Sequence, residues 1–270
     1  MLDNFFKYQS IGNDFIIFDC FHKDIETLNS TILNKSWKPF VIKICKRHFG
    51  IGADGVLIIK KDKEGKLPEL LVYNSDGSKA EICINGLRCA ALHLRDYHDL
   101  DKKLKIKIGQ KITTCQINKN NVNIKISNIQ YKKSKEIKVH EKNFLGHIVK
   151  VPNQHFVIPQ KITSDWLSKN GKLIESHKAF KGKTNVEFVW PKDQKNKFYN
   201  VLVYERGVGP TLACGSGAAA IVWSLFRTHK IKINQKINLM FPGGKIVCWI
   251  DKNKKVSLQA PCKLVFKGHI

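Results

Sequence analysis

The sequence predicts an α+β protein with two pseudo-symmetric domains, each a curved, mostly antiparallel sheet wrapped around a central helix, and an active site in the cleft between them. The first observation is a repeat: Tyr73 lies ten residues before Cys83, as Tyr204 lies ten before Cys214, and a glycine follows each cysteine by three positions. The second is that most of the remaining chain shows short strand patterns. The third is that each half has one strongly apolar helix pattern directly after its cysteine.

The repeat divides the chain into a first half, residues 1–127, and a second half, residues 128–262. A terminal strand over residues 263–270 is expected to return to the first half. The chain has 270 residues, of which 43% are hydrophobic, so it is long enough to bury a substantial core in one large domain or two smaller ones.

Alternating apolar residues between turn signals predict the strands of the first half. These strands are residues 5–10, 14–20, 56–61, 70–74, 103–109, 111–117 and 121–127. Apolar residues at helical spacing predict a helix over 36–49, with Ser36 as a candidate N-cap, and a second helix over 85–98.

A lysine-rich link over residues 131–143 is expected to connect the two halves. The strands predicted in the second half are residues 147–151, 155–159, 185–190, 197–206, 236–241, 245–250, 255–260 and 263–268. Short helices are predicted over 164–171 and 217–229. The helix over 217–229 is apolar nearly all round, so we expect the sheet to enclose it.

The chain carries a formal charge of +25, from 47 Lys+Arg against 22 Asp+Glu, which is a reason to consider an anionic partner. Almost all of the positive charge is lysine, however, spread through predicted loops and solvated strand faces. We therefore expect weak nonspecific binding of nucleic acid at low salt and no specific nucleic-acid partner. Lys7 and Asp3 interrupt the apolar N-terminal residues, and no apolar run is long enough to span a membrane, so a cytoplasmic protein is expected.

Eight cysteines are scattered through the chain without CxxC pairs, a pattern typical of reduced cytosolic thiols. Zinc is poorly supported, because Cys83 and Cys89 are six residues apart and His93 and His98 have no second cysteine pair nearby. We therefore expect no metal. The cysteines expected in the core or within strands are Cys20, Cys45, Cys89, Cys115, Cys248 and Cys262.

Cys83 and Cys214 stand apart because both sit where a strand gives way to a helix, among glycines and polar residues. The N-terminus of a helix stabilises an anion, so it can lower the pKa of a thiol and can hold a substrate carboxylate. If both sulfurs face one cleft, one can remove a proton from a carbon atom while the other delivers a proton to its opposite face. The result would be inversion of a stereocentre. Taken singly, each cysteine would be interpreted as a small buried residue.

Several motifs occur in a fixed order: GNDF, GIGADG, NSDGS before a cysteine and NGLRC, Asn-x-His, TNVEF, and ERGVGPTLACGSGA. Through them the sequence resembles the diaminopimelate epimerase family nearly end to end. The last motif is highly specific, whereas GADG or NSDGS alone would be weak. The resemblance implies epimerisation of LL-diaminopimelate to meso-diaminopimelate, in lysine and peptidoglycan precursor synthesis, with Cys83 and Cys214 as the acid/base pair. It also implies an amino-acid substrate and neither pyridoxal phosphate nor metal.

The resemblance further implies which residues bind the substrate. Those expected at its distal amino-acid end are Asn13, Asn74, Asn153, Asn185 and Arg206. Those whose backbone N–H groups would hold the carboxylate at the reacting centre are Ile84, Asn85, Gly215 and Ser216. His155 and Glu205 would lie near the reacting centre and its amino group. A buried Arg206 beside Glu205 would clamp a carboxylate bidentately, whereas outside this motif the two residues would be interpreted as a surface ion pair.

Two positions depart from the family pattern. The family usually has glycine directly after the first cysteine, where this chain has Ile84. A positive φ there would strongly disfavour a β-branched residue, whereas a negative φ would keep the N–H and require only room for the side chain. The second departure is Pro152-Asn153-Gln154-His155, where the family usually reads Gly-Asn-Pro-His.

Two alternatives stay open beside this interpretation. The nearer one is another two-cysteine racemase or epimerase with the same fold. The other is a basic nucleic-acid-binding protein, which the net charge of +25 suggests. The oligomeric state is open as well, with a homodimer as one alternative.

Overall fold

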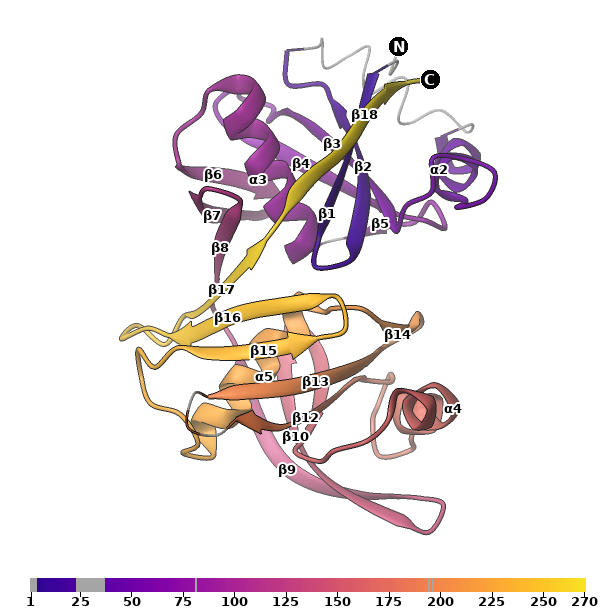
Figure 1. The fold of residues 1–270 in the computed structure, drawn as a ribbon, viewed down its shortest axis with the longest axis vertical. Coiled ribbons are helices and arrows are strands. Elements are labelled where there is room, and N and C mark those ends of the chain that lie inside the picture. The colour runs from indigo at the N-terminus through magenta and orange to yellow at the C-terminus, as the bar shows by residue number, and fades with distance from the viewer. Residues whose placement is uncertain (1–3, 23–36, 81, 194, 196) are drawn as a thin grey trace. The chain divides into compact units, whose positions relative to one another are not determined.

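The computed structural model describes the 270-residue chain except for residues 1–3, 23–36, 81, 194 and 196 (Figure 1). The chain forms two compact units. The first comprises residues 1–124 and 261–270, and the second comprises residues 125–260. The N-cap predicted at Ser36 lies outside the described residues.

Strands make up most of the first unit. They are β1 (Asn4–Ser10), β2 (Asn13–Asp19), β3 (Gly55–Lys61), β4 (Pro68–Asn74), β5 (Lys79–Ala80), β6 (Lys103–Ile108), β7 (Lys111–Asn118), β8 (Asn121–Ile126) and β18 (Lys263–His269). Neighbouring strands pair in the order β18, β1, β2, β3, β4, β6, β7, β8. Only the β2–β3 and β4–β6 pairs in this series are parallel, which confirms the prediction of a mostly antiparallel sheet.

The second unit repeats this pairing order. Its strands are β9 (Gln130–Val139), β10 (Lys142–Val151), β11 (Asn153–Ile158), β12 (Asn185–Asp193), β13 (Phe198–Glu205), β14 (Gly209–Thr211), β15 (Ile237–Phe241), β16 (Gly244–Ile250) and β17 (Val256–Pro261). The parallel pairs are β11–β12 and β13–β15, at the same places in the series as in the first unit. Strand β9 pairs with β10 as β18 pairs with β1. The repeat inferred from two cysteine-bearing stretches therefore extends over the whole of both sheets.

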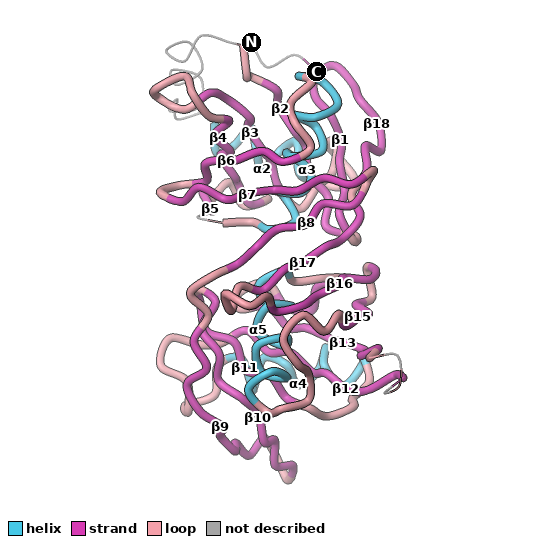
Figure 2. Tube along the Cα trace, turned by 90° about the vertical axis from the view of Figure 1, so that its left-hand side faces the viewer, coloured by secondary structure: helices cyan, strands magenta, loops and turns pink. Residues whose placement is uncertain are grey.

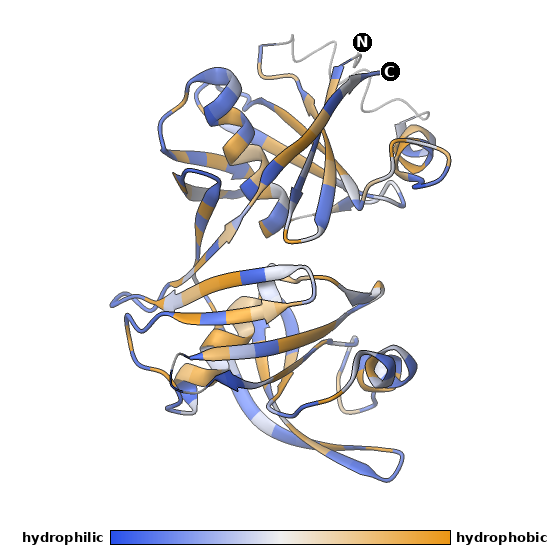
Figure 3. Cartoon of the chain, in the orientation of Figure 1, coloured by the Kyte–Doolittle hydropathy of each residue, from blue (hydrophilic) through white to orange (hydrophobic). Residues whose placement is uncertain are grey.

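One helix in each unit is enclosed by its sheet (Figure 2). Helix α3 (Ile84–His98) contacts β1, β2, β3, β4, β6, β7 and β18, and α5 (Gly215–Arg227) contacts β9, β10, β11, β12 and β16. Figure 3 shows α5 mostly in pale to deep orange, and nine of its 13 residues are buried. The prediction that the sheet encloses this apolar helix is therefore confirmed.

In the part of the chain that the structure describes, two further helices pack on the outside of the sheets. Helix α2 (Trp37–Cys45) packs on β3, and α4 (Ser164–Glu175) packs on β12, β13 and β14. Helix α4 begins with an N-cap at Thr163, whose hydroxyl oxygen accepts the Trp166 N–H at 3.2 Å. Within the ranges that the structure describes, no helix has the length and apolar character needed to cross a membrane.

The prediction of a lysine-rich link over residues 131–143 is wrong. These residues form most of β9 and the beginning of β10, which pair antiparallel. The side chains of Ile137 and Val139 are buried in the core of the second unit, while Glu136 and Lys138 lie exposed on the opposite face. The high density of lysine hid the strand because Lys133 and Lys135 occupy the same face as Ile137 and Val139, so the alternation of apolar and charged residues is limited to the end of β9.

Candidate active site

The two cysteines that the sequence singles out occupy equivalent positions. Cys83 is the N-cap of α3 and Cys214 is the N-cap of α5, both with extended backbone angles. The Gly86 N–H donates to Cys83 Sγ at 3.3 Å, and the Gly217 N–H donates to Cys214 Sγ, also at 3.3 Å. Each sulfur therefore takes the place that a serine or aspartate oxygen has in an ordinary N-cap.

The glycines allow the close approach between each cysteine and its helix. A Cβ atom added to Gly86 would lie 3.3 Å from Cys83 Sγ, and one added to Gly217 would lie 3.3 Å from Cys214 Cβ and 2.8 Å from Glu187 Oε1. Neither glycine has a positive φ, so their role is to leave space and not to adopt an unusual backbone conformation.

The residues directly after each cysteine form the first turn of its helix. Ile84 and Asn85 begin α3, and Gly215 and Ser216 begin α5. Backbone N–H groups in the first turn of a helix have no acceptor within the helix, so they can bind an anion. Ile84 has no positive φ and its side chain is buried, so the departure from glycine at this position keeps the N–H and adds a packed side chain.

Asn13 and Asn85 are joined in the first unit. The Asn85 side chain donates to Asn13 Oδ1 at 3.3 Å, and the Asn13 side chain donates to Asp54 Oδ2 at 2.7 Å. Arg88, itself a residue of α3, is fully buried and donates to Asn85 Oδ1 at 2.5 Å. Asn74 lies beside this group, because its neighbour Ser75 donates its N–H to the Asp54 carbonyl at 3.1 Å.

The beginning of β2, where Asn13 lies, is held by ion pairs. Arg47 donates to Asp14 at 2.7 and 3.0 Å and to Asp54 at 2.7 Å, and the buried Lys7 ammonium lies 2.8 Å from Asp14. Burial alone would raise the pKa of Asp14, but hydrogen bonds from Arg47 and Lys7 hold the pKa at about 2. Asp14 is therefore ionised at neutral pH and anchors this edge of the candidate site.

A buried carboxylate–imidazole pair, formed by Glu187 and His155, lies next to the first turn of α5, the helix that Cys214 caps. His155 Nδ1 is 2.6 Å from Glu187 Oε1, and both side chains are fully buried. His155 Nε2 is 3.1 Å from Asn153 Oδ1, so the departing Pro-Asn-Gln-His segment still brings Asn153 and His155 together on β11. Glu187 also lies directly against Gly217, at the beginning of α5.

Glu205 links the end of β13 to Cys214. It accepts a hydrogen bond from the Thr211 hydroxyl at 2.6 Å and is hydrogen-bonded to the Cys214 side chain.

Asn185 accepts the Arg206 N–H at 3.0 Å and donates to the Gln154 carbonyl at 2.9 Å. The expectation of a buried Arg206 is wrong, because its side chain is exposed and reaches the Gly182 carbonyl at 3.5 Å.

The expectation that the helix N-terminus lowers the pKa of the thiol is wrong for Cys214. Burial, together with the charges of Glu205 and Glu187, raises the pKa of Cys214 well above its usual range. Hydrogen bonds from Ser216 and from the Gly217 N–H act in the opposite direction and are outweighed. Cys214 is therefore a neutral thiol at physiological pH, suited to giving a proton.

The other six cysteines fulfil the structural prediction. All six are buried and free of disulfide bonds: Cys20, Cys45, Cys89, Cys115, Cys248 and Cys262. Burial raises the pKa of Cys115 and of Cys262 to about 12. They are packing residues with little tendency to ionise.

Three residues of the site escaped prediction from the sequence. They are Asp54, Arg88 and Glu187, each inside a motif that the sequence shows. Glu187 had a usable signal, because it lies two residues after Asn185 on one strand and therefore on the same face. Arg88 had none, since an arginine on an apolar helix gives no indication that it is fully buried.

The fold belongs to a class of proteins built from two repeated α+β units. A hydroxyproline epimerase from Agrobacterium vitis shares it with a TM-score of 0.73 at 8% identity, over 99% of this chain and 92% of that one. A PhzF family protein from Enterococcus faecalis shares it with a TM-score of 0.69 at 11% identity, over 100% and 99% of the two chains. These likenesses define the fold.

Sequence similarity defines the family within this class. Residues 5–134 and 148–263 match the Diaminopimelate epimerase family, and the chain belongs to it. The diaminopimelate epimerase of Prochlorococcus marinus NATL1A is 34% identical over 296 residues, covering 100% of this chain and 99% of the relative. The diaminopimelate epimerase of Carboxydothermus hydrogenoformans is 32% identical and covers 98% of both chains. The protein is therefore an isomerase.

Proposed function

We propose that this protein inverts one α-carbon of LL-diaminopimelate to give meso-diaminopimelate, with Cys83 and Cys214 as the acid/base pair. The observation that carries the proposal is the matched capping of α3 and α5, in which each sulfur accepts the N–H of a glycine three residues on, at 3.3 Å. Two equivalent sulfurs suit a reaction in which a proton leaves one face of a carbon atom and another arrives at the opposite face.

The proton transfers balance without a cofactor. In one direction Cys83, as a thiolate, removes the α-proton, and Cys214, as a thiol, delivers its proton to the other face of the same carbon. The raised pKa of Cys214 supports its part as the proton donor in this direction. The product leaves Cys83 protonated and Cys214 ionised, so the pair must exchange its protonation states, or run in reverse, before the next turnover.

The helix N-termini supply the electrostatic support that the reaction needs. A carbanion next to a carboxylate carries extra negative charge, which unpaired first-turn N–H groups stabilise. We assign this role to Ile84 and Asn85 in the first unit and to Gly215 and Ser216 in the second. The remaining polar residues, Asn13, Asn74, Asn153, Asn185 and Arg206, would hold the distal amino-acid end. Since Arg206 is exposed, a bound carboxylate would be its partner.

His155 and Glu205 are assigned to the second cysteine. Glu205 is hydrogen-bonded to Cys214, and its own pKa is raised because it is buried. When Glu205 is ionised, its negative charge raises the pKa of the Cys214 thiol. His155 is fixed by Glu187 at 2.6 Å, and the same Glu187 lies against Gly217. We propose Glu187 as a positioning residue that sets the orientation of His155 and supports the first turn of α5.

The decisive experiment is incubation with LL-diaminopimelate and a panel of L-amino acids in heavy water under reducing conditions. We expect α-deuteration and inversion of diaminopimelate. Exchange on another amino acid alone would favour a racemase of different specificity. Absence of exchange on every substrate, together with nucleic-acid binding that falls steeply with salt, would favour the alternative suggested by the charge of +25.

Replacing either sulfur should stop inversion, because each face of the carbon atom needs its own proton carrier. We expect Cys83→Ala and Cys214→Ala each to lower the rate by roughly 10²–10⁴-fold. Cys248→Ala is the matched control, since Cys248 is a buried strand cysteine and its loss should affect stability but not the chemical step. Full activity in either Cys83→Ala or Cys214→Ala would rule out the two-cysteine mechanism.

A further inference from the structure

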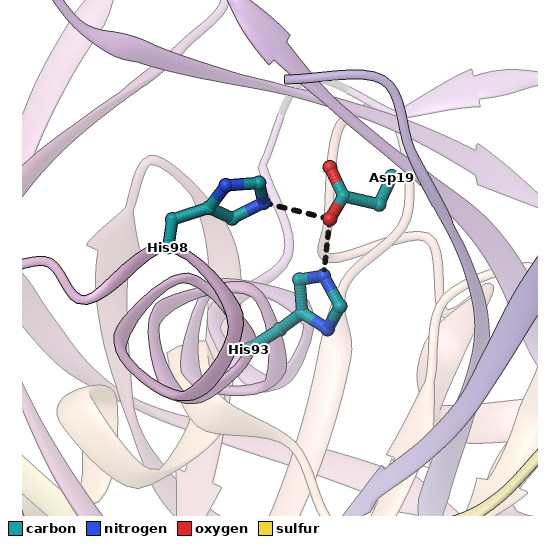
Figure 4. Close-up of side chains that lie close together, drawn as sticks. All are labelled: Asp19, His93 and His98. Carbon is teal, nitrogen blue, oxygen red and sulfur yellow. Dashed lines mark hydrogen bonds and ion pairs between the residues drawn. The ribbon is translucent and has the colours of Figure 1, made fainter. Parts of the chain in front are cut away.

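Two imidazoles and a carboxylate converge at the far end of α3 from Cys83. His93 Nε2 lies 2.9 Å and His98 Nε2 lies 2.7 Å from the same oxygen, Asp19 Oδ2 (Figure 4). The histidines come from the last turns of α3 and Asp19 ends β2. One ligand atom from each residue lies within 4.8 Å of the other two.

This set of donors has the chemistry of a transition-metal site. Two imidazole nitrogens and one carboxylate oxygen are ligands that zinc and related ions prefer, and three protein ligands leave a coordination position for water. Zinc binds such atoms at about 2.0–2.1 Å, which places tetrahedral ligands about 3.3 Å apart. The distances of 2.9 and 2.7 Å therefore need to lengthen by roughly half an ångström when an ion replaces the bridging protons.

The side chains are held in orientations that suit an ion. Asp19 Oδ1 accepts the Phe21 N–H at 3.1 Å, which turns Oδ2 toward the imidazoles. His98 Nδ1 lies 3.2 Å from His22 Nε2, so the second ring nitrogen of His98 has a partner, as in most metal-binding histidines. The His93 ring stacks on Tyr97 with 4.7 Å between centroids, and His93 is fully buried.

The position of the cluster separates it from the cysteine chemistry. Helix α3 has 15 residues, so its last residue lies about 22 Å along the axis from the Cys83 end. The C-terminal end of a helix carries the negative end of its dipole, which favours a cation there. Sequence spacing could not indicate the cluster because Asp19 and His93 are 74 residues apart in the chain.

We propose that Asp19, His93 and His98 bind one divalent transition-metal ion of the zinc class, which ties the end of β2 to the last turn of α3. The ion takes the place of the Nε2 protons between the imidazoles and the carboxylate; each neutral imidazole then carries its single proton on Nδ1, and only a second proton, on a ring that was doubly protonated, passes to solvent. Its role is structural. It takes no part in proton transfer at the substrate, so the proposal is independent of the proposed function.

The test is a titration of the untagged, full-length chain with Zn²⁺ by calorimetry and with Co²⁺ by visible absorption. The Cys83→Ala/Cys214→Ala background removes the two thiols that could otherwise bind the metal. We expect one equivalent of metal per chain, a higher unfolding temperature with zinc, and an absorption spectrum of cobalt bound by nitrogen and oxygen ligands.

Three variants separate this site from adventitious binding. His98→Gln should abolish the tight binding of one zinc ion per chain, because it removes a ligand. His22→Gln should lower the zinc affinity by about tenfold, because it removes only the residue that contacts the second ring nitrogen of His98. His140→Asn is the control, since His140 is exposed at the β9–β10 turn and should leave binding unchanged. Unchanged zinc affinity in a folded His98→Gln variant, or no binding in the background chain, would overturn the proposal.

Discussion

Cys214 shows how burial and a helix N-terminus compete for the charge of one thiol. The Gly217 N–H and the Ser216 hydroxyl both favour the thiolate, yet the pKa is raised because Cys214 is buried near two carboxylates. A buried carboxylate is an effective means of keeping a thiol protonated, because the low dielectric strengthens the repulsion between the two anions. In this protein, a thiol can therefore stay protonated at a helix end that would ordinarily favour an anion.

Asp14 gives a residue-scale prediction about acid stability. The pKa of Asp14 is lowered from 3.8 to about 2, although burial acts in the opposite direction, because Arg47 and Lys7 donate hydrogen bonds to it. A lowered pKa in the folded state stabilises the protein above the unfolded value near 4, and this contribution is lost as pH falls through about 2. The shift corresponds to about 2 kcal/mol in the free energy of unfolding.

The prediction is checked by urea unfolding of the wild-type chain and Asp14→Asn between about pH 5 and pH 2. The wild type should be more stable at the upper pH, and the difference between the two proteins should shrink by about 2 kcal/mol toward the lower pH. A difference that stays constant across this range would show that Asp14 does not titrate as the ion pairs require.

At the scale of elements, α3 and α5 begin in the same way but tolerate an added methyl group differently. A Cβ at Gly217 would lie 2.8 Å from Glu187 Oε1, which is held at 2.6 Å by His155. A Cβ at Gly86 would meet the end of the flexible Leu57 side chain at 3.1 Å. We expect Gly217→Ala to cost about 1–3 kcal/mol in the free energy of unfolding and to impair epimerisation, whereas Gly86→Ala should cost less than about 1 kcal/mol.

The two glycine variants act as controls for each other, because both place alanine at the third position of an enclosed helix. Urea unfolding gives the stability of each, and deuterium exchange into the substrate gives its activity. Equal losses in both variants would show that the Glu187–His155 pair has no special sensitivity to the space at Gly217.

Local patterns explain why some elements could be predicted and others could not. The spacing shared by the Cys83 and Cys214 stretches is a property of adjacent residues, so the repeat, the enclosed helices and the candidate cysteine pair could all be inferred. Strand β9 could not, because its buried residues are only Ile137 and Val139 among many lysines. The groups formed by Glu187 with His155 and by Asp19 with His93 join different elements, which sequence spacing does not record.

At the scale of the whole molecule, the last strand completes the first unit. Strand β18 pairs antiparallel with β1 along its length, and Figure 1 shows the yellow strand beside the indigo one. Phe266 packs edge-on against Phe5 at 5.9 Å between ring centroids. The first unit is therefore assembled from both ends of the sequence, and the second unit from the residues between them.

Removal of residues 263–270 should weaken the first unit selectively. The outer edge of β1 would lose its backbone partners from Asn4 to Gln9. Hydrogen exchange read out by mass spectrometry should show faster exchange of β1 amides and unchanged exchange in β10 to β17. Full protection of β1 in the truncated chain would contradict this prediction.

The place of β18 also determines the order in which the protein is completed on the ribosome. All residues of the second unit leave the exit tunnel before β18 does, so the first unit cannot complete its sheet before the second unit has emerged. Until β18 emerges, β1 has no pairing partner along one edge of the first unit's sheet. A nascent chain of this protein therefore carries an unfinished, aggregation-prone edge through the synthesis of more than a hundred residues.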